Sequence, residues 1–322
     1  MICLGIESTA HTFGAGICDE NKIYSNIRDS YKPDEGGIHP RLASDHHAAV
    51  SGEVVRKALS EAGLLLNDVD LVAFSNAPGL GPCLRIGAAT ARTIALMINK
   101  PLIPVNHCIA HIEVGRRLLR CIDPVTLYVS GANTQIIAYQ GGVYRVFAET
   151  LDMGVGNFID SFARYAGIPF PGGPFIEDKA KQGHYVKLPY VIKGMDVSLT
   201  GILTNLRDKL NKYKFQDLCY SLQETVFAML VEVSERALAH TQKNELLFTG
   251  GVAANSRLRE MCGVMCSERG AKLFVPDKQY CVDNGAMIAV LGLKMHESGI
   301  KQPFNTSINQ KQRTDQVIIK WR

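Results

Sequence analysis

Two histidines four residues apart, His107 and His111, have the spacing of a metal-binding pair in this sequence of 322 residues. On a helix, side chains at this spacing lie one above the other on the same face, and two neutral imidazoles can bind one metal ion. His107 would lie in the first turn, where the positive end of the helix dipole favours the neutral, metal-binding form. A packed structural pair is the alternative, because the chain contains nine histidines.

Tyr128 and Asp283 are candidate oxygen ligands for the same site. Tyr128 ends a predicted strand, and Asp283 stands at a predicted helix N-cap, where an aspartate is ordinarily structural. Two imidazoles, a carboxylate and a phenolate would make a mixed nitrogen and oxygen site that suits iron or zinc. The spacing alone does not bring these two residues to the histidines.

Glycine-rich turns supply a second set of candidates. Gly250-Gly251 follows a predicted strand, and Gly154 and Gly172-Gly173 open predicted helices that carry Asp160 and Glu177. Glycine lets backbone amides approach a phosphate closely, and a helix N-terminus favours an anion. The sequence contains no G-x-x-x-x-G-K-[ST] string, so a phosphate site here would not be a P-loop. Each turn could be purely structural, but together they favour nucleotide binding.

The elements that must position these residues repeat along the chain. Residues 2–26 alternate like three strands joined by two turns, and residues 125–149 repeat that order. The polar breaks after the first strands end at Thr12 and Thr134, an offset of 122 residues (134 − 12). Each meander is followed by alternating helices and strands. The pattern predicts two α/β lobes, residues 1–122 and 123–322, with a nucleotide site between them and the last helix and tail packing back on the first lobe.

Periodicity and end signals also predict the individual elements after each meander. The predicted helix at 107–119 has Asn106 as its N-cap. The other predicted helices are 41–62, 84–98, 158–166, 175–182, 215–242, 255–269 and 284–297, and the predicted strands are 71–74, 102–105, 246–248 and 273–275.

Composition limits the class of protein. A net charge of +4 neither requires nor excludes a nucleic-acid partner. Nine scattered cysteines without a C-x-x-C predict buried thiols in a reducing compartment, not a disulfide framework or zinc ribbon. No apolar run approaches the roughly 18 residues of a membrane helix. We therefore expect a cytoplasmic protein without a membrane partner.

Several strings, taken together and in order, closely resemble one family. They are Ile6-Glu7-Ser8-Thr9-Ala10-His11-Thr12, Asn106-His107-Cys108-Ile109-Ala110-His111, Tyr128-Val129-Ser130-Gly131, Pro171-Gly172-Gly173-Pro174 and Gly250-Gly251-Val252-Ala253-Ala254-Asn255. The family is that of the tRNA N6-threonylcarbamoyladenosine synthesis proteins. Tyr128 and Arg313-Thr314-Asp315 favour its archaeal and eukaryotic branch, the catalytic subunit of the KEOPS complex, formerly called O-sialoglycoprotein endopeptidase.

The resemblance implies an actin-like ATPase fold and a metal-dependent acyltransferase. It implies one iron or zinc ion on His107, His111, Tyr128 and Asp283, and an adenine nucleotide, ATP or threonylcarbamoyl-adenylate, with or without Mg²⁺. The implied reaction moves the threonylcarbamoyl group to N6 of the adenosine 3′ of the anticodon, in tRNAs reading codons that begin with A. The general base stays unassigned. The implied nucleotide residues are Ser130, Gly131, Asn133, Asp160, Gly173, Glu177 and Asn255.

The resemblance also implies partners. These are tRNA, a small protein kinase and other KEOPS subunits, with the kinase in some archaea fused after a tail like the one ending at Trp321-Arg322. The modest net charge agrees with partners that supply part of the grip on tRNA, because each phosphate contact needs a lysine or arginine.

Three other classes of protein are alternatives to this family. A metalloprotease would need the glutamate of H-E-x-x-H or H-x-x-E-H, which His107-Cys108-Ile109-Ala110-His111 lacks. A small-molecule kinase of the same fold would use the nucleotide turns but leave the histidine pair unexplained. A DNA-binding module or scaffold would suit the basic charge, but no DNA-reading motif is present.

Overall fold

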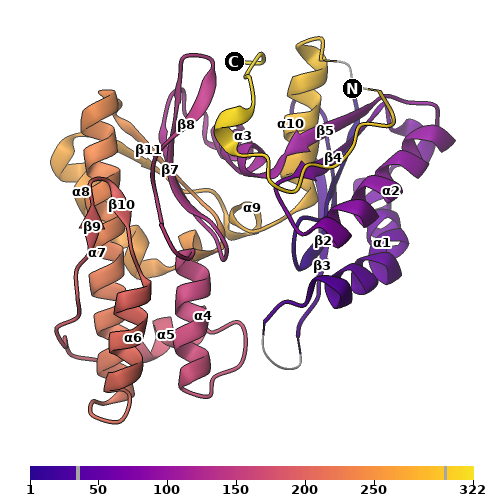
Figure 1. The fold of residues 1–322 in the computed structure, drawn as a ribbon. Helices are drawn as coiled ribbons and strands as arrows, with labels where there is room; N and C mark the ends of the chain where they lie inside the picture. The colour runs from indigo at the N-terminus through magenta and orange to yellow at the C-terminus, as the bar shows by residue number, and fades with distance from the viewer. Residues whose placement is uncertain (34–36, 301–302) are drawn as a thin grey trace. The chain divides into compact units, whose positions relative to one another are not determined.

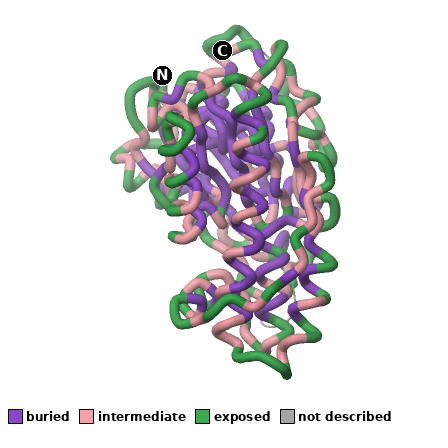
Figure 2. Tube along the Cα trace, turned by 90° about the vertical axis from the view of Figure 1, so that its left-hand side faces the viewer, coloured by how far each residue is buried: buried purple, intermediate pink, exposed green. Residues whose placement is uncertain are grey.

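The computed structural model describes residues 1–33, 37–300 and 303–322, and the chain divides into two units (Figure 1). Unit 1 comprises residues 1–117, 141–144 and 283–322, and unit 2 comprises residues 118–140 and 145–282. Each unit has its own apolar core. Buried residues follow the strands and the inner helix faces, whereas exposed residues follow the loops and helix ends (Figure 2).

Unit 1 is built on a five-stranded sheet in the order β3-β2-β1-β4-β5. Strand β1 pairs antiparallel with β2 and parallel with β4. The strands are β1 Cys3–Glu7, β2 Thr12–Cys18, β3 Ile23–Ser30, β4 Leu71–Ala77 and β5 Leu102–Asn106, and the helices are α1 Pro40–Ala62, α2 Gly81–Met97, α3 His107–Leu119 and α10 Gly285–Glu297.

Alternation along β1 and β2 decides which helix covers which face of this sheet. Leu4 and Ile6 point into the core that α1 and α2 complete. Gly5 and Gly16 point the other way, toward α10, where a Cβ on either would lie 2.2 Å from a backbone nitrogen of the helix. Glycine on that face therefore lets α10 approach the strands at backbone distance.

Unit 2 repeats the arrangement with a sheet in the order β12-β11-β6-β7-β8. Helices α4, α7 and α8 contribute apolar side chains to its core. The strands are β6 Val125–Val129, β7 Thr134–Gln140, β8 Val143–Glu149, β11 Glu245–Thr249 and β12 Lys272–Phe274, with a small pair β9 Ile192–Lys193 and β10 Asp196–Val197. The helices are α4 Val155–Tyr165, α5 Gly173–Ala180, α6 Thr200–Lys209, α7 Phe215–Thr241, α8 Ser256–Arg269 and α9 Lys278–Cys281.

The predicted duplication is confirmed. In both sheets an antiparallel meander is extended by two parallel strands added beside its first strand, in the same spatial order. The second strands of the two meanders begin at Thr12 and Thr134, the residues that the repeat predicted. The chain is therefore two α/β repeats.

The predicted helices and strands are present within a few residues of their expected ends. Helix α6, the four-residue helix α9 and the short β9–β10 pair were not predicted. Residues 192–209, which form α6 and the strand pair, mix apolar and polar residues without a clear period. All nine cysteines are buried, as expected, and no disulfide joins them in the part of the chain that the structure describes. None of the described helices combines the length and apolar character needed to cross a bilayer.

Candidate functional site

Helix α3 begins directly after β5 and carries His107 and His111 on one face. The side-chain oxygen of Asn106 accepts a hydrogen bond from the backbone N–H of Ile109 at 3.3 Å, so Asn106 caps the helix as predicted. Both histidines are buried. Their ring centroids lie 4.8 Å apart with the planes nearly perpendicular, at 86°.

Asp283 completes a three-residue cluster with these histidines within unit 1. Its Oδ1 lies 3.5 Å from Nε2 of His107 and 3.4 Å from Nε2 of His111. The prediction that Asp283 is the N-cap of its helix was wrong. Asn284 is the N-cap of α10, and its side chain accepts from the N–H of Met287 at 2.9 Å. With the capping role filled by its neighbour, the Asp283 carboxylate is directed to the histidines.

The spacing of the cluster fits a metal ion. Ligand atoms placed about 2.1 Å from zinc at tetrahedral corners are about 3.4 Å from one another, close to the two distances from Asp283. One ligand atom from each residue can be chosen so that all three lie within 4.8 Å of one another. His107, His111 and Asp283 could therefore hold one metal ion, and two imidazoles with one carboxylate suit iron or zinc.

Glu7, at the end of β1, fixes the orientation of His107. Its Oε2 lies 2.9 Å from Nδ1 of His107, and its Oε1 accepts from the N–H of Thr9 at 2.6 Å. A carboxylate bound to Nδ1 leaves Nε2 as the ligand atom, the usual support for a metal-binding histidine. The sequence prediction gave Glu7 no role. The available signal was a carboxylate ending a strand whose five residues are all buried.

The carboxylates set the charge of this cluster. Burial lowers the pKa of the His107 imidazole, but the neighbouring Glu7 and Asp283 outweigh it and raise that pKa to about 9. Burial lowers the pKa of His111. Burial also opposes ionisation of Asp283, yet the two histidines hold its pKa well below its usual range. The cluster thus favours a positive charge beside the Asp283 oxygen.

Tyr128 belongs to unit 2, where it is buried near the end of β6 and pairs in register with Gln135 and Thr249. It stays a predicted fourth ligand.

The predicted nucleotide residues all lie in unit 2. Ser130, Gly131 and Asn133 form the turn between β6 and β7, closed by the N–H of Asn133 donating to the Ser130 hydroxyl at 3.0 Å. The turn rests on the start of α4, because the N–H groups of Gly156 and Asn157 donate to the carbonyls of Ser130 and Gly131. A Cβ at Gly156 would lie 2.7 Å from Gly131 Cα, so this contact requires glycine.

The remaining candidates lie at or bind two helix N-termini, those of α5 and α8. Oδ1 of Asp160, on α4, accepts from the N–H of Gly172 just before α5, at 2.8 Å. Oε1 of Glu177, on α5, accepts from the N–H of Ser256, the first residue of α8, at 2.8 Å. Gly173 begins α5, and Asn255 caps α8 by accepting from the N–H of Leu258 at 3.1 Å. These contacts therefore link α4 to the start of α5, and α5 to the start of α8.

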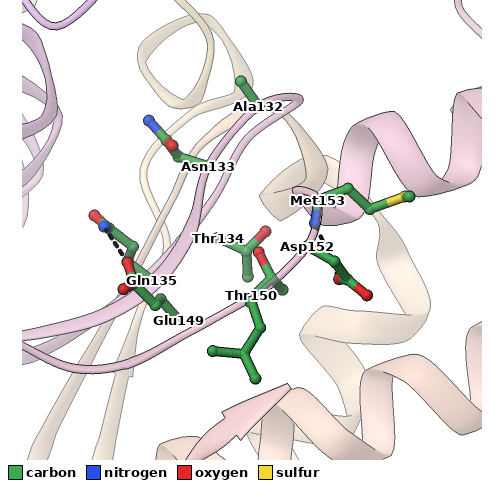
Figure 3. A pocket seen from close by; sticks show the side chains of 9 residues that line it. Ala132, Asn133, Thr134, Gln135, Glu149, Thr150, Asp152 and Met153 are labelled. Carbon is green, nitrogen blue, oxygen red and sulfur yellow. Dashed lines mark hydrogen bonds between the residues drawn. The ribbon is translucent and has the colours of Figure 1, made fainter. Parts of the chain in front are cut away.

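A pocket of about 110 Å³ lies beside the turn between β6 and β7 (Figure 3). Asn133 and Gln135 line one side and the stretch from Glu149 to Met153 the other, and a hydrogen bond joins Gln135 to Glu149. Ligand pockets typically have volumes of about 300–1,000 Å³. This pocket is too small for a whole nucleotide.

Comparison with known proteins identifies the family of this chain. The family model described as tRNA N6-adenosine threonylcarbamoyltransferase matches residues 22–290. The chain belongs to this family. It is similar to the tRNA N6-adenosine threonylcarbamoyltransferase of Thermococcus kodakarensis, at 54% identity over the whole of both chains. The family's enzymes modify tRNA, and the resemblance seen in the sequence is confirmed.

Two further similarities concern the length of the relatives and the fold of this chain. A probable bifunctional tRNA threonylcarbamoyladenosine biosynthesis protein of Thermoplasma volcanium is 54% identical over all of this chain, which spans 62% of that longer protein. Component A of the Acidaminococcus fermentans (R)-2-hydroxyglutaryl-CoA dehydratase matches 92% of this chain and 99% of its own, with a TM-score of 0.58 and 12% identity. That likeness concerns the fold alone and agrees with the predicted actin-like ATPase fold.

Proposed function

We propose that this chain transfers the threonylcarbamoyl group from threonylcarbamoyl-adenylate to N6 of the adenosine 3′ of the anticodon, in tRNAs reading codons that begin with A. The observation that carries the proposal is the family match over residues 22–290, which includes His107, His111, Asp283 and every predicted nucleotide residue.

In the proposed reaction, a bond forms between adenosine N6 and the carbonyl carbon of the donor. The bond from that carbon to the AMP phosphate oxygen breaks, N6 loses a proton, and AMP leaves. Negative charge grows on the carbonyl oxygen and on the departing phosphate. Groups that stabilise this charge would therefore lower the barrier.

An iron or zinc ion on His107, His111 and Asp283, with Tyr128 as fourth ligand, would supply a Lewis acid for the donor. Two neighbouring residues hold these ligands in place. Glu7 keeps Nε2 of His107 aimed at the ion by holding Nδ1. Asn284 caps α10, so Asp283 stays available as a ligand.

Helix starts would hold the phosphate of the adenylate. Asp160 and Glu177 each fix a backbone N–H at the start of a neighbouring helix, α5 and α8. Each carboxylate occupies the N–H that it binds, so the phosphate would meet the other backbone N–H groups of these helix starts, which the two contacts hold in position. The turn at Ser130–Asn133 adds further backbone groups beside the start of α4.

We also propose tRNA, a small protein kinase and other KEOPS subunits as partners, and action in the cytoplasm, where tRNA is modified. The bifunctional relative supports a second activity working beside this one, because it is described as bifunctional and this chain spans 62% of its length.

A direct assay tests the proposal. The full chain with its partner subunits would be incubated with threonylcarbamoyl-adenylate and tRNA, with His111→Ala as the test variant and His240→Ala, an exposed histidine of unit 2, as control. We expect His111→Ala to lose bound metal and transfer while keeping its thermal transition, and His240→Ala to match the unsubstituted chain. Full transfer by a His111→Ala protein that holds no metal would refute the role of the metal. ATP-dependent phosphorylation of a polyol, with no modified tRNA, would instead identify a small-molecule kinase.

A further inference from the structure

The positive charge of this chain is concentrated in one segment of unit 2. Residues 164–214 contain nine lysines and arginines against four aspartates and glutamates, a net charge of +5. The whole chain carries only +4, so the remaining residues sum to −1. The segment runs from the end of α4 through α5 and α6 to the start of α7.

Three exposed aromatic rings within this segment each have a cation over the face. Arg207 lies 5.9 Å from the ring centre of Tyr165, Lys179 lies 5.2 Å from that of Phe175, and Lys209 lies 5.8 Å from that of Tyr213. The rings are 44%, 41% and 46% exposed, respectively. Rings with this much exposure can stack against the bases of a nucleic acid. These six residues are here called the aromatic–basic surface.

The aromatic–basic surface draws its six residues from α4, α5, α6 and the turn between α6 and α7. The Tyr165–Arg207 pair joins α4 to α6. Phe215, at the start of α7, stacks on Phe162 of α4 with ring centres 5.7 Å apart and lies 6.3 Å from Phe175 of α5. Lys209 and Tyr213 stand at the α6–α7 turn. Figure 1 shows α4, α5, α6 and the start of α7 gathered at one end of unit 2.

We propose that the aromatic–basic surface binds the anticodon loop of the substrate tRNA. This inference rests on the proposed function, which requires an adenosine of that loop to reach the enzyme. Proteins bind unpaired RNA by stacking bases on aromatic rings and pairing phosphates with lysine and arginine. Exposed rings interleaved with cations, on a segment with a net charge of +5, match that chemistry.

The position of the surface within unit 2 agrees with this partner. Phe175 lies on α5 between Gly173 and Glu177, two of the proposed nucleotide residues. An RNA loop held at Phe175 would present its bases beside the proposed site of the adenylate donor. Asp178 and Asp208, which approach Lys179 and Arg207 within 4.0 Å and 3.5 Å, are too few to neutralise the segment.

The test measures affinity of the full chain for a labelled anticodon stem-loop RNA by fluorescence anisotropy across a range of salt concentrations. Tyr165→Ala and Tyr213→Ala remove rings, and Lys209→Ala removes a cation. Each ring substitution should weaken binding about tenfold or more if a base stacks there. Lys209→Ala should reduce the slope of log affinity against log salt by about 0.7. Tyr213→Phe keeps the ring and should bind as the unsubstituted chain does.

A matched control exists in unit 1. Lys22 lies 4.2 Å from the ring centre of Tyr24, so Tyr24→Ala disrupts the same kind of pair outside the aromatic–basic surface. It should leave RNA affinity unchanged. In the transfer assay with partner subunits, Tyr213→Ala should raise KM for tRNA without changing KM for threonylcarbamoyl-adenylate.

The possible outcomes separate this inference from the proposed function. If Tyr165→Ala and Tyr213→Ala bind RNA as tightly as the unsubstituted chain, and that chain transfers normally, the aromatic–basic surface does not bind the anticodon loop. The proposed function would be unaffected by that result. Loss of a protein partner from these variants with RNA affinity intact would also overturn this inference, by showing a protein-docking surface. Absence of transfer by the unsubstituted complex would refute the proposed function, and the anisotropy measurement would still decide whether this surface binds RNA.

Discussion

Oε2 of Glu7 lies 2.9 Å from Nδ1 of His107, across 100 residues of sequence. The contact joins the last residue of β1 to the first residue of α3 and fixes which ring nitrogen of His107 can bind a metal. The first strand of the chain thus contributes to the candidate metal centre without supplying a ligand.

Replacing Glu7 by Gln should weaken metal binding about 10–100-fold, the usual effect of losing a group that supports a ligating histidine. Metal retained after competition with a graded series of chelator concentrations measures this loss. Glu20→Gln, an exposed residue of the same unit, is the control and should retain metal normally. Equal retention in both variants would mean that Glu7 does not support the ligand.

Adding a methyl group at Gly16 should separate α10 from the sheet. The new Cβ would lie 2.2 Å from the backbone nitrogen of Ala286, so the helix must move, at a cost of about 1–3 kcal/mol in the free energy of unfolding. Asp283 precedes this helix by two residues, so Gly16→Ala should also lose metal. Denaturant unfolding and metal content measure the two effects.

Gly52→Ala is the matched control for Gly16→Ala. Gly52 lies inside α1, and a Cβ there would meet no atom within 4 Å. Since alanine favours a helix over glycine, Gly52→Ala should stabilise the chain by about 0.5–1 kcal/mol with metal content unchanged. A loss of metal in the Gly52 variant would show that the assay reports general damage.

Glu113 should make stability depend on pH below neutrality. This buried carboxylate accepts hydrogen bonds from Arg116 at 3.0 Å, Lys294 at 2.9 Å and the phenol of Tyr144 at 2.5 Å. Burial opposes its charge, but Lys294 and Arg116 lower its pKa below the usual 4.5. Because the folded pKa is the lower one, Glu113 stabilises the fold above about pH 4.5, and this contribution is lost as the pH falls through the folded pKa.

Glu113→Gln should therefore cost about 3–5 kcal/mol at neutral pH, because it leaves the charges of Arg116 and Lys294 without their anion. The variant should also lose less stability than the unsubstituted chain as the pH falls below 4.5. Denaturant midpoints at several pH values measure both effects. Parallel pH curves for the two proteins would contradict the assignment.

Asn255 has a structural task that must be separated from its proposed nucleotide contact. Its side-chain oxygen caps α8, and its amide donates to Gln223 at 2.8 Å. Asn255→Ala should cost about 1 kcal/mol of stability by loss of the cap. Asn255→Asp keeps a capping oxygen, and the Gln223 amide can turn over to donate to the new carboxylate, so this variant should retain stability. Its added negative charge should weaken adenine-nucleotide binding. Calorimetric titration with ATP, beside thermal unfolding, distinguishes the two roles.

Local patterns predicted the repeat and its elements because each depends on nearby residues: alternation in the meanders, the Asn106 cap, and glycine before helices. The cluster was predicted in part, since the spacing of His107 and His111 is local, whereas the approach of Asp283 depends on the packing of α10 against glycine-lined strands. The N-cap prediction for Asp283 was wrong because the next residue, Asn284, which also has a capping side chain, is the N-cap of α10. Glu7 could not be found from spacing, since its partner His107 is 100 residues away.

The distance in sequence between His111 and Asp283 also has a consequence for biosynthesis. A ribosome adds about 5–20 residues per second, so the 172 residues between them take roughly 10–30 s to translate. During that interval the histidine pair is present without its carboxylate, and the glycine face of β1 and β2 has no α10 to cover it. The three-residue metal centre can therefore form only after Asp283 has been made, so metal loading of unit 1 follows the synthesis of the whole of unit 2.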